Sequence, residues 1–450
     1  MKHCFLILLL LPFLMGGQNS VTGKMEPDNN YSWILLYKME NGKQIYLQNA
    51  EVKNGEFEFQ LPEKEAAGVY RTYYQLENEL FVEFLYNKQP INFTFNPNNP
   101  LSTLTFLNSD ENKLYQDYFH SISAKQKQLD SVQVDFFKET DSKSDKKLVK
   151  TYQQKREEVI KTQAGFELKS KGKLANHFIS ADKQFNASLP IKNPQEYLKV
   201  VKQHFFDAID FNDSILINSA YINDKIIDYI FYLNISSAEE TLQNLQKESM
   251  AIGLDKITSY PELKKTVLEN ILKEYADQQK NDMVNYVFEN YYNNLPGSLQ
   301  DNAFRYQILS QVKTAVGKKA PNISWEENGV SKDLYGLQDS DYYMVLFFSS
   351  DCSHCQVEVP QFYNFSKELY NMKVIAIGLE DEKEGWEEMI KILPGFTHIL
   401  DLQKWDSPRV SDYGIVAIPS YFLLDKDKNI IAKPESFNNI QAMFEVVEEE

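Results

Sequence analysis

The chain has 450 residues, 43% of them hydrophobic and 13% aromatic, which can supply folded cores and excludes a disordered chain. This length suggests about three domains. Its formal net charge of -17 argues against a nucleic-acid partner, because such binding depends on Lys and Arg side chains that neutralise phosphates.

The N-terminal stretch MKHCFLILLLLPFLMGGQNS predicts a secretory signal peptide. Lys2 precedes an apolar run from Cys4 to Leu14, which is too short to span a bilayer, and small and polar residues follow it. We take residues 1–17 as the signal peptide, although cleavage after Ser20 fits as well, and an uncleaved anchor is the alternative. The sequence therefore predicts a periplasmic or otherwise exported protein.

Residues 18–107 are predicted to form a β-sandwich-like domain. Between Tyr31 and Phe95 the residues favour about six or seven antiparallel strands. Asn41-Gly42 lies between two apolar runs and suits a hairpin turn, because both residue types tolerate positive φ. LSTLTFL, at 101–107, is expected to be the last strand.

Residues 108–316 are predicted to be helical. Apolar residues recur at spacings of three and four in the segments 196–209, 225–233, 262–276 and 282–292. Ser237 and Glu240 have the spacing of a capping box. Residues 124–174 are rich in Lys, Gln and Glu, which indicates a long solvated helical hairpin.

Residues 317–450 are predicted to form an α/β domain with a mixed sheet. The order is strand, helix, strand, helix, strand, strand, helix, starting with the buried strand in DYYMVLFFSS. The expected fold is therefore multidomain: an N-terminal antiparallel β domain, a central all-α region and a C-terminal α/β domain.

Cys352 and Cys355 are the two cysteines that remain once the signal peptide is removed. A disulfide between them would close only a tiny loop and so stabilise the fold little, which suggests a chemical role. The strand before them ends at Phe348, so Cys352 should lie in the loop or first turn of the next helix. Free N–H groups there favour a thiolate, which makes Cys352 the attacking sulfur and Cys355 the resolving one.

Four motifs resemble those of the thioredoxin fold. The resemblance is strongest to the periplasmic thioredoxin-like oxidoreductases of the TlpA/ResA kind. The four motifs are Ala320-Pro321, FFSSDCSHC, Cys355-x-x-Glu358-x-Pro360 and Ile418-Pro419, in that order. The β-then-helical leader also resembles that of extra-cytoplasmic thioredoxin-like proteins.

The resemblance implies roles for individual residues. Glu358 would be the base for the resolving thiol, with an exposed carboxylate as the alternative. Pro419 would be cis and would shape a substrate groove in which the backbone of Ile418 pairs with an extended substrate segment. This sequence departs from the family at Asp351, where a Trp is usual, and at Leu346, where thioredoxin has a buried Asp.

His354 lies between the two cysteines and would stabilise a thiolate if protonated, which makes a disulfide more oxidising. The negative charge of Asp351 would disfavour the thiolate. We expect an intermediate reduction potential, more oxidising than that of thioredoxin; the alternative for His354 is a solvated residue without a role.

Three other functions compete with this interpretation. A zinc site would need four ligands, and His120, His177, His204, His354 and His398 form no spaced pair to complete the cysteines. A peroxidase of the peroxiredoxin fold would need a Thr near the reactive Cys and an Arg downstream, where the chain offers Ser349 and Arg409. A binding or assembly protein with a structural disulfide is the third.

We therefore predict an exported thiol–disulfide oxidoreductase with a redox-active centre at Cys352 and Cys355. No metal and no cofactor are implied. The expected partners are protein thiols and disulfides and a membrane electron-transfer protein, and self-association is an option. The direction of electron flow, the substrate and the role of residues 18–316 are left open.

Overall fold

The computed structural model describes residues 19–28, 31–76, 79–327, 329–369 and 371–445. The predicted signal peptide, residues 1–17, lies outside the described residues. The chain divides into two compact units, Met1–Val267 and Leu268–Glu450. This division falls within helix α9 (Pro261–Asp277), and the domain boundaries at 107/108 and 316/317 stay predictions.

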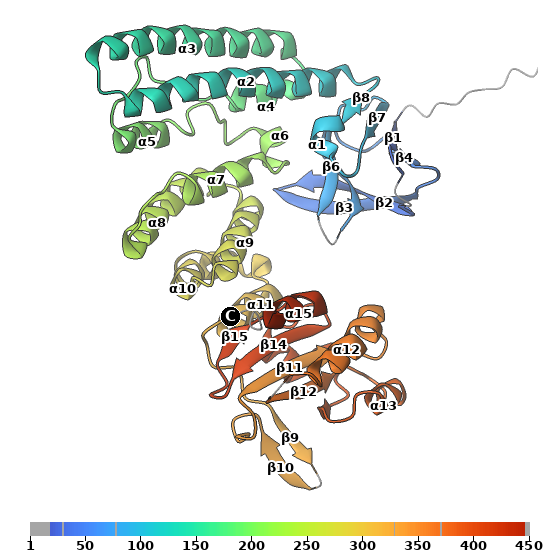
Figure 1. Ribbon diagram of the computed structural model, residues 1–450. Coiled ribbons are helices and arrows are strands. Elements are labelled where there is room, and N and C mark those ends of the chain that lie inside the picture. The colour runs from blue at the N-terminus through green and yellow to red at the C-terminus, as the bar shows by residue number, and fades with distance from the viewer. Residues whose placement is uncertain (1–18, 29–30, 77–78, 328, 370, 446–450) are drawn as a thin grey trace, which may run out of the picture. The chain divides into compact units, whose positions relative to one another are not determined.

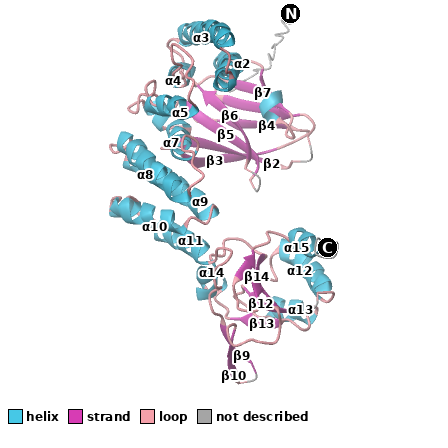
Figure 2. Cartoon of the chain, turned by 60° about the vertical axis from the view of Figure 1, so that its left-hand side comes forward, coloured by secondary structure: helices cyan, strands magenta, loops and turns pink. Residues whose placement is uncertain are grey.

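The first unit begins with two four-stranded sheets (Figure 1). Their strand orders are β4-β1-β7-β8 and β3-β2-β5-β6, and Figure 2 shows these strands in magenta. The strands are β1 (Ser20–Met25), β2 (Trp33–Glu40), β3 (Lys43–Glu51), β4 (Glu56–Gln60), β5 (Gly68–Gln75), β6 (Leu80–Tyr86), β7 (Ile91–Phe95) and β8 (Thr105–Phe106). All pairings are antiparallel except that of β1 with β7.

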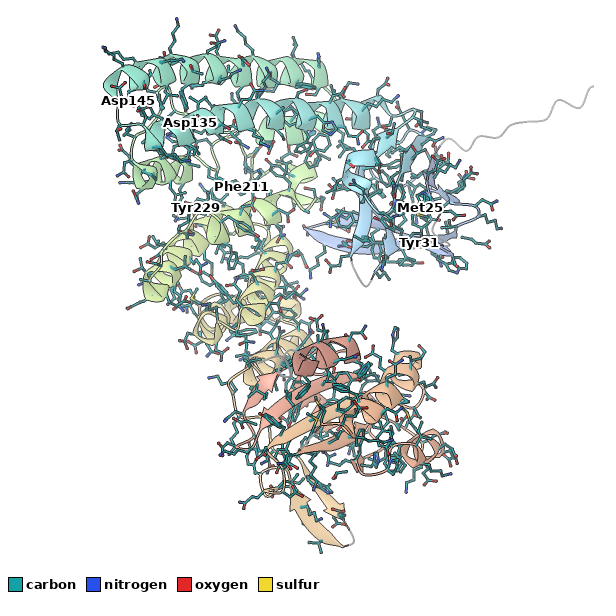
Figure 3. The ribbon with its side chains drawn as sticks, in the orientation of Figure 1. Met25, Tyr31, Asp135, Asp145, Phe211 and Tyr229 are labelled. Atoms are coloured by element: carbon teal, nitrogen blue, oxygen red, sulfur yellow. The ribbon has the colours of Figure 1, made fainter. Side chains whose placement is uncertain are left out.

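One hydrophobic cluster joins the two sheets. Val21 and Phe93 of the first sheet and Leu36 and Phe84 of the second are all buried in it. Met25, labelled in Figure 3, is also part of the cluster. The shared core confirms the predicted antiparallel β domain.

Two local predictions in this region have different outcomes. The Asn41-Gly42 turn joins β2 to β3 with φ of 49° and 74°, as predicted. The strand expected at 101–107 is wrong over its first part, because Pro100–Thr103 form the short helix α1 and only Thr105–Phe106 form a strand. Pro100 occupies the first turn of that helix, where its missing N–H costs nothing.

The helices that follow confirm a helical region. Helices α2 and α3 run side by side as the predicted hairpin (Figure 1). The helices are α2 (Asp110–Lys138), α3 (Ser142–Ser170), α4 (Ala175–Ala181), α5 (Pro194–Gln203), α6 (Ser214–Ile217), α7 (Tyr221–Phe231), α8 (Glu239–Lys256), α9, α10 (Asn281–Asn290) and α11 (Asn302–Lys313). Short 3-10 turns lie at Tyr292–Asn294 and Gly297–Leu299.

Two helix predictions need correction. The helix expected at 196–209 ends at Gln203, and Phe206 beyond it packs against Tyr229, with ring centroids 4.5 Å apart. The capping box of Ser237 and Glu240 is wrong, because Ala238 is the N-cap of α8 and makes no side-chain cap bond. The Ser236 hydroxyl accepts from the Ala238 N–H instead, at 3.1 Å.

The second unit contains a five-stranded mixed sheet in the order β13-β12-β11-β14-β15. β11 is parallel to β12 and antiparallel to β14. Three elements were not predicted: the β9–β10 hairpin that precedes the sheet, its edge strand β13 and helix α14. The elements are β9 (Ser324–Glu327), β10 (Val330–Asp333), β11 (Tyr342–Phe348), α12 (Ser353–Ser366), β12 (Met372–Gly378), α13 (Glu384–Lys391), β13 (Thr397–Leu400), η3 (Lys404–Asp406), α14 (Pro408–Tyr413), β14 (Ser420–Asp425), β15 (Ile430–Ala432) and α15 (Phe437–Glu445).

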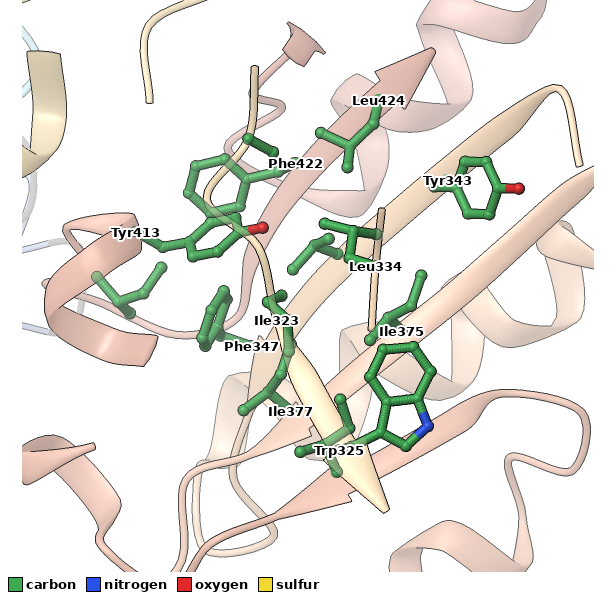
Figure 4. Close-up of a cluster of buried hydrophobic side chains, with 14 of the residues drawn as sticks. Ile323, Trp325, Leu334, Tyr343, Phe347, Ile375, Ile377, Tyr413, Phe422 and Leu424 are labelled. Carbon is green, nitrogen blue, oxygen red and sulfur yellow. The ribbon is translucent and has the colours of Figure 1, made fainter. Parts of the chain in front are cut away.

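Each face of this sheet has its own core, because side chains alternate along every strand. On one face, Leu346 and Phe348 pack under α12, α13 and α15 (Figure 2). On the other face, Phe347, Tyr413 and Phe422 pack together (Figure 4). This arrangement confirms the predicted α/β domain with a mixed sheet.

Helix α11 packs against α14 within the second unit. The Tyr306 hydroxyl donates to Ser411 Oγ at 3.0 Å, and the Thr314 hydroxyl donates to the Tyr413 carbonyl at 3.4 Å. Part of the helical region therefore shares a compact unit with the α/β fold.

Candidate active site

The cysteine pair lies where β11 gives way to α12. Cys352 is the N-cap residue of α12, and the backbone N–H of Cys355 donates to its Sγ at 3.2 Å. A Ser, Thr or Asp oxygen usually fills this position. The helix end places free N–H groups and a partial positive charge beside the sulfur. The predicted location of Cys352 is confirmed.

The two sulfurs differ in access to solvent. Cys352 is half-buried, whereas Cys355 is fully buried, and both are free thiols. Burial raises the pKa of the Cys355 thiol above its usual range, and the neighbouring Cys352 adds to the rise. Cys355 therefore holds its proton at neutral pH while Cys352 faces outward.

The Ile418–Pro419 peptide bond is cis, as predicted. The carbonyl of Ile418 accepts a hydrogen bond from Cys352 Sγ at 3.5 Å. Ile418 and Pro419 are both half-buried. The loop before β14 therefore lies directly against the outward-facing sulfur.

Glu358 is one turn beyond Cys355 on α12. Its carboxylate accepts the backbone N–H of Phe437 at 3.0 Å, at the start of α15, and the side chain is half-buried. Its negative charge contributes to the raised pKa of Cys355, after burial and Cys352. Glu358 is therefore a partly buried carboxylate one turn from the resolving thiol, and its role as the base stays a prediction.

Asp351 and His354 are both exposed. The Asp351 N–H donates to Ser349 Oγ at 3.2 Å. The charge of Asp351 also contributes to the raised pKa of the exposed Lys404 amine, although Asp381 is the larger cause. The roles of Asp351 and His354 in tuning the thiols stay predictions.

Glu380 is a site residue that sequence reasoning missed. It follows β12, is 2% exposed, and its carboxylate accepts the backbone N–H of Ser350 and, at 3.1 Å, the hydroxyl of Ser349. The strand order explains its place, because β11 and β12 are parallel neighbours and the residues that follow them meet at one sheet edge. Glu380 therefore holds the loop that leads to Cys352.

Tyr421 was also missed. It lies on β14 with 1% exposure, and its hydroxyl is buried without a hydrogen-bond partner among the described residues. Burial raises the pKa of the Tyr421 phenol, and the charges of Glu358, Cys355 and Cys352 add to the rise. The alternation of SYFLLD placed it on one sheet face, but only the fold shows which groups lie there.

The structure bears on two competing sites, a zinc site and the site of a peroxidase. Within the described residues no group of three or more His, Cys, Asp or Glu side chains could hold a metal ion. The pair that a peroxidase would use is engaged elsewhere: Arg409 donates to Asp401 and to the Ser324 carbonyl, and Ser349 donates to Glu380.

Family models match two parts of the chain. Residues 339–430 match a model described as thioredoxin-like. These residues form a thioredoxin-like domain. The site described above belongs to this thioredoxin-like domain, apart from its contact with Phe437. Residues 20–115 match a domain of unknown function, DUF4369.

Solved structures resemble parts of the chain. A domain of possible thiol-disulfide isomerase from Cytophaga hutchinsonii is 30% identical, with 30% of this chain and 94% of that chain covered and a TM-score of 0.26. The thioredoxin domain of a thiol-disulfide oxidoreductase from Bacteroides vulgatus is 24% identical, with 30% and 97% covered and a TM-score of 0.26. A thioredoxin-like protein from Bacteroides caccae is 17% identical, with 59% and 98% covered and a TM-score of 0.36.

No curated protein matches the chain. None of the helices in the described part of the chain is both long and apolar enough to cross a membrane.

Proposed function

We propose that this protein is an exported thiol–disulfide oxidoreductase whose thioredoxin-like domain reduces or exchanges disulfides in protein substrates. The observation that supports it most is the asymmetry of the pair. The half-buried Cys352 caps a helix and contacts the Ile418 carbonyl, whereas Cys355 is buried behind it with a raised pKa.

The reaction begins at Cys352. Its thiolate attacks one sulfur of a substrate disulfide, which forms a mixed disulfide and releases the other substrate sulfur as a thiolate. Cys355 then loses its proton to Glu358 and attacks Cys352 Sγ. A Cys352–Cys355 disulfide forms, the second substrate sulfur leaves, and the two electrons of the dithiol have passed to the substrate. The same steps in reverse oxidise a substrate dithiol.

The groups around the pair serve this chemistry. Ile418 and Pro419 shape the groove in which an extended substrate segment lies beside Cys352. His354 stabilises the thiolate and Asp351 opposes it, and both effects are modest because both side chains are exposed. The redox pair needs no cofactor. Its electrons come from, or go to, another protein, for which a membrane electron-transfer partner is the proposal.

Trapping of the mixed disulfide tests this function. The Cys355→Ser variant, incubated with glutathione disulfide, should accumulate one glutathione on Cys352, detected by mass spectrometry after digestion. The matched Cys352→Ser variant should stay almost unmodified, because Cys355 is buried. If neither variant forms the adduct, or if both form it equally, the proposed roles are wrong and a binding protein with a structural cysteine pair takes their place.

A further inference from the structure

The Tyr421 hydroxyl is one of a few buried side-chain polar atoms in the described residues without a hydrogen-bond partner. Such a group is costly in a folded protein, and one that persists calls for an explanation in function or in a bound water. The buried Tyr421 hydroxyl is such a group.

Tyr421 lies in the same part of the fold as the two cysteines. Tyr421 belongs to the same buried cluster as Cys355, Val359 and Phe362 of α12. Its ring packs edge-on against Phe362, with centroids 5.5 Å apart. Besides burial, the charges of Glu358, Cys355 and Cys352, all on α12 or at its start, raise the pKa of its phenol. Tyr421 therefore lies beneath the helix that carries the resolving thiol.

A backbone hydrogen bond from Ser349 lowers the pKa of Cys355, although burial raises it by more. Glu358 accepts from the Phe437 N–H, and Cys352 Sγ accepts from the Cys355 N–H. In the dithiol state Cys355 is protonated, so it offers the Tyr421 O–H no thiolate. A thiolate formed at Cys355 would be a buried negative charge, and such a charge needs a donor.

We propose that the Tyr421 hydroxyl donates a hydrogen bond to the Cys355 thiolate that forms in the resolving step, an inference that rests on the proposed function. The proton of Cys355 moves to Glu358, and the thiolate attacks Cys352 Sγ. The bond between Cys352 and the substrate sulfur breaks, and that sulfur leaves as a thiolate, which is protonated by solvent. Tyr421 keeps its own proton throughout, because burial and the nearby negative charges raise the pKa of its phenol.

Single-turnover kinetics of the reduced full chain with glutathione disulfide test this. Formation of the mixed disulfide by Cys352 and its resolution by Cys355 are followed separately by acid quenching and mass spectrometry. In Tyr421→Phe the first step should be unchanged and the second at least about tenfold slower. The pH profile of the second step should also move to higher pH. Thermal stability should be kept or increased, because the lost hydroxyl has no partner.

Tyr413→Phe is the matched control. Tyr413 is buried on the other face of the sheet, and its hydroxyl donates to the Pro321 carbonyl at 2.7 Å. This variant should melt at a lower temperature with both steps unchanged. A second step within about twofold of the wild type in Tyr421→Phe overturns the inference alone. A wild-type protein that forms no glutathione adduct overturns the proposed function, and the inference with it.

Discussion

Cys352 and Cys355 lie one helical turn apart, yet burial separates their chemistry. Because burial raises the pKa of Cys355 above the ordinary thiol value of about 8.5, only a small fraction is ionised at neutral pH. In Glu358→Gln, where the proposed internal base is removed and the Cys355 proton must go to solvent, the resolving step should therefore speed up about tenfold per pH unit between about pH 7 and pH 8.5. Quenched-flow measurement of the rate at which the mixed disulfide is resolved checks this. A rate that stops rising already below pH 7 would contradict the raised pKa of Cys355.

Glu380 is buried and supports the loop before Cys352 through Ser349 and Ser350. In Glu380→Gln an amide hydrogen-bond donor replaces one of the two accepting oxygens. We expect the free energy of unfolding to fall by about 2 kcal/mol, since hydrogen bonds to charged groups are worth about 1.5–3 kcal/mol. The attack by Cys352 should also slow.

Denaturant unfolding and the rate of glutathione adduct formation measure both effects. Glu382→Gln is the control, because Glu382 is an exposed carboxylate two residues away, and its effect should stay within about 0.5 kcal/mol. Equal effects of the two substitutions would show that Glu380 does not support the loop.

The sequence sufficed for the residues whose roles follow from local spacing. Cys352 lies at the start of α12 and the bond before Pro419 is cis, both as predicted. Glu380 and Tyr421 were missed, because their contacts depend on which strands are neighbours in the sheet. β12 and β14 are the neighbours of β11 in the sheet, but they begin more than twenty and more than seventy residues, respectively, after β11 ends. A single sequence does not contain that strand order directly.

At the scale of elements, Glu358 joins α12 to the first turn of α15. Two substitutions separate this anchoring from its proposed role as a base. In Glu358→Gln the amide oxygen still accepts the Phe437 N–H, so stability should change by less than about 0.5 kcal/mol, while resolution slows by roughly a hundredfold.

In Glu358→Ala the anchor is lost as well, and stability should fall by about 1 kcal/mol with the same kinetic loss. Thermal unfolding and single-turnover kinetics give the two readouts. A Glu358→Gln variant that resolves the mixed disulfide at the wild-type rate would show that the carboxylate is not the base.

Elements with strong periodicity were predictable, and those fixed by distant partners were not. The α2–α3 hairpin and the buried strands β11 and β12 follow their sequence patterns. β1 was missed because SVTGKM has no strong alternation, and its partners β4 and β7 lie far along the chain. The helix at Pro100–Thr103 was taken for strand as part of the segment LSTLTFL, although Leu101 is 92% exposed.

At the scale of the molecule, the compact second unit extends beyond the predicted domain of residues 317–450. α11 contributes the Tyr306 and Thr314 contacts to α14, and its Ile308 and Val312 are buried. A fragment of residues 317–450 should therefore be less stable than one of residues 260–450, by about 2 kcal/mol or more. Urea unfolding of both fragments checks this, and equal stability would support the boundary at 316/317.

The central claim is that Cys352 and Cys355 cycle between dithiol and disulfide. The most direct test is the equilibrium reduction potential of the full chain against glutathione buffers, with His354→Ala measured alongside. We predict reversible titration at a potential between about -270 mV and about -120 mV, the values of thioredoxin and of a strong oxidant, and a more negative value for His354→Ala. A pair that is not reduced and reoxidised under native conditions would contradict the account.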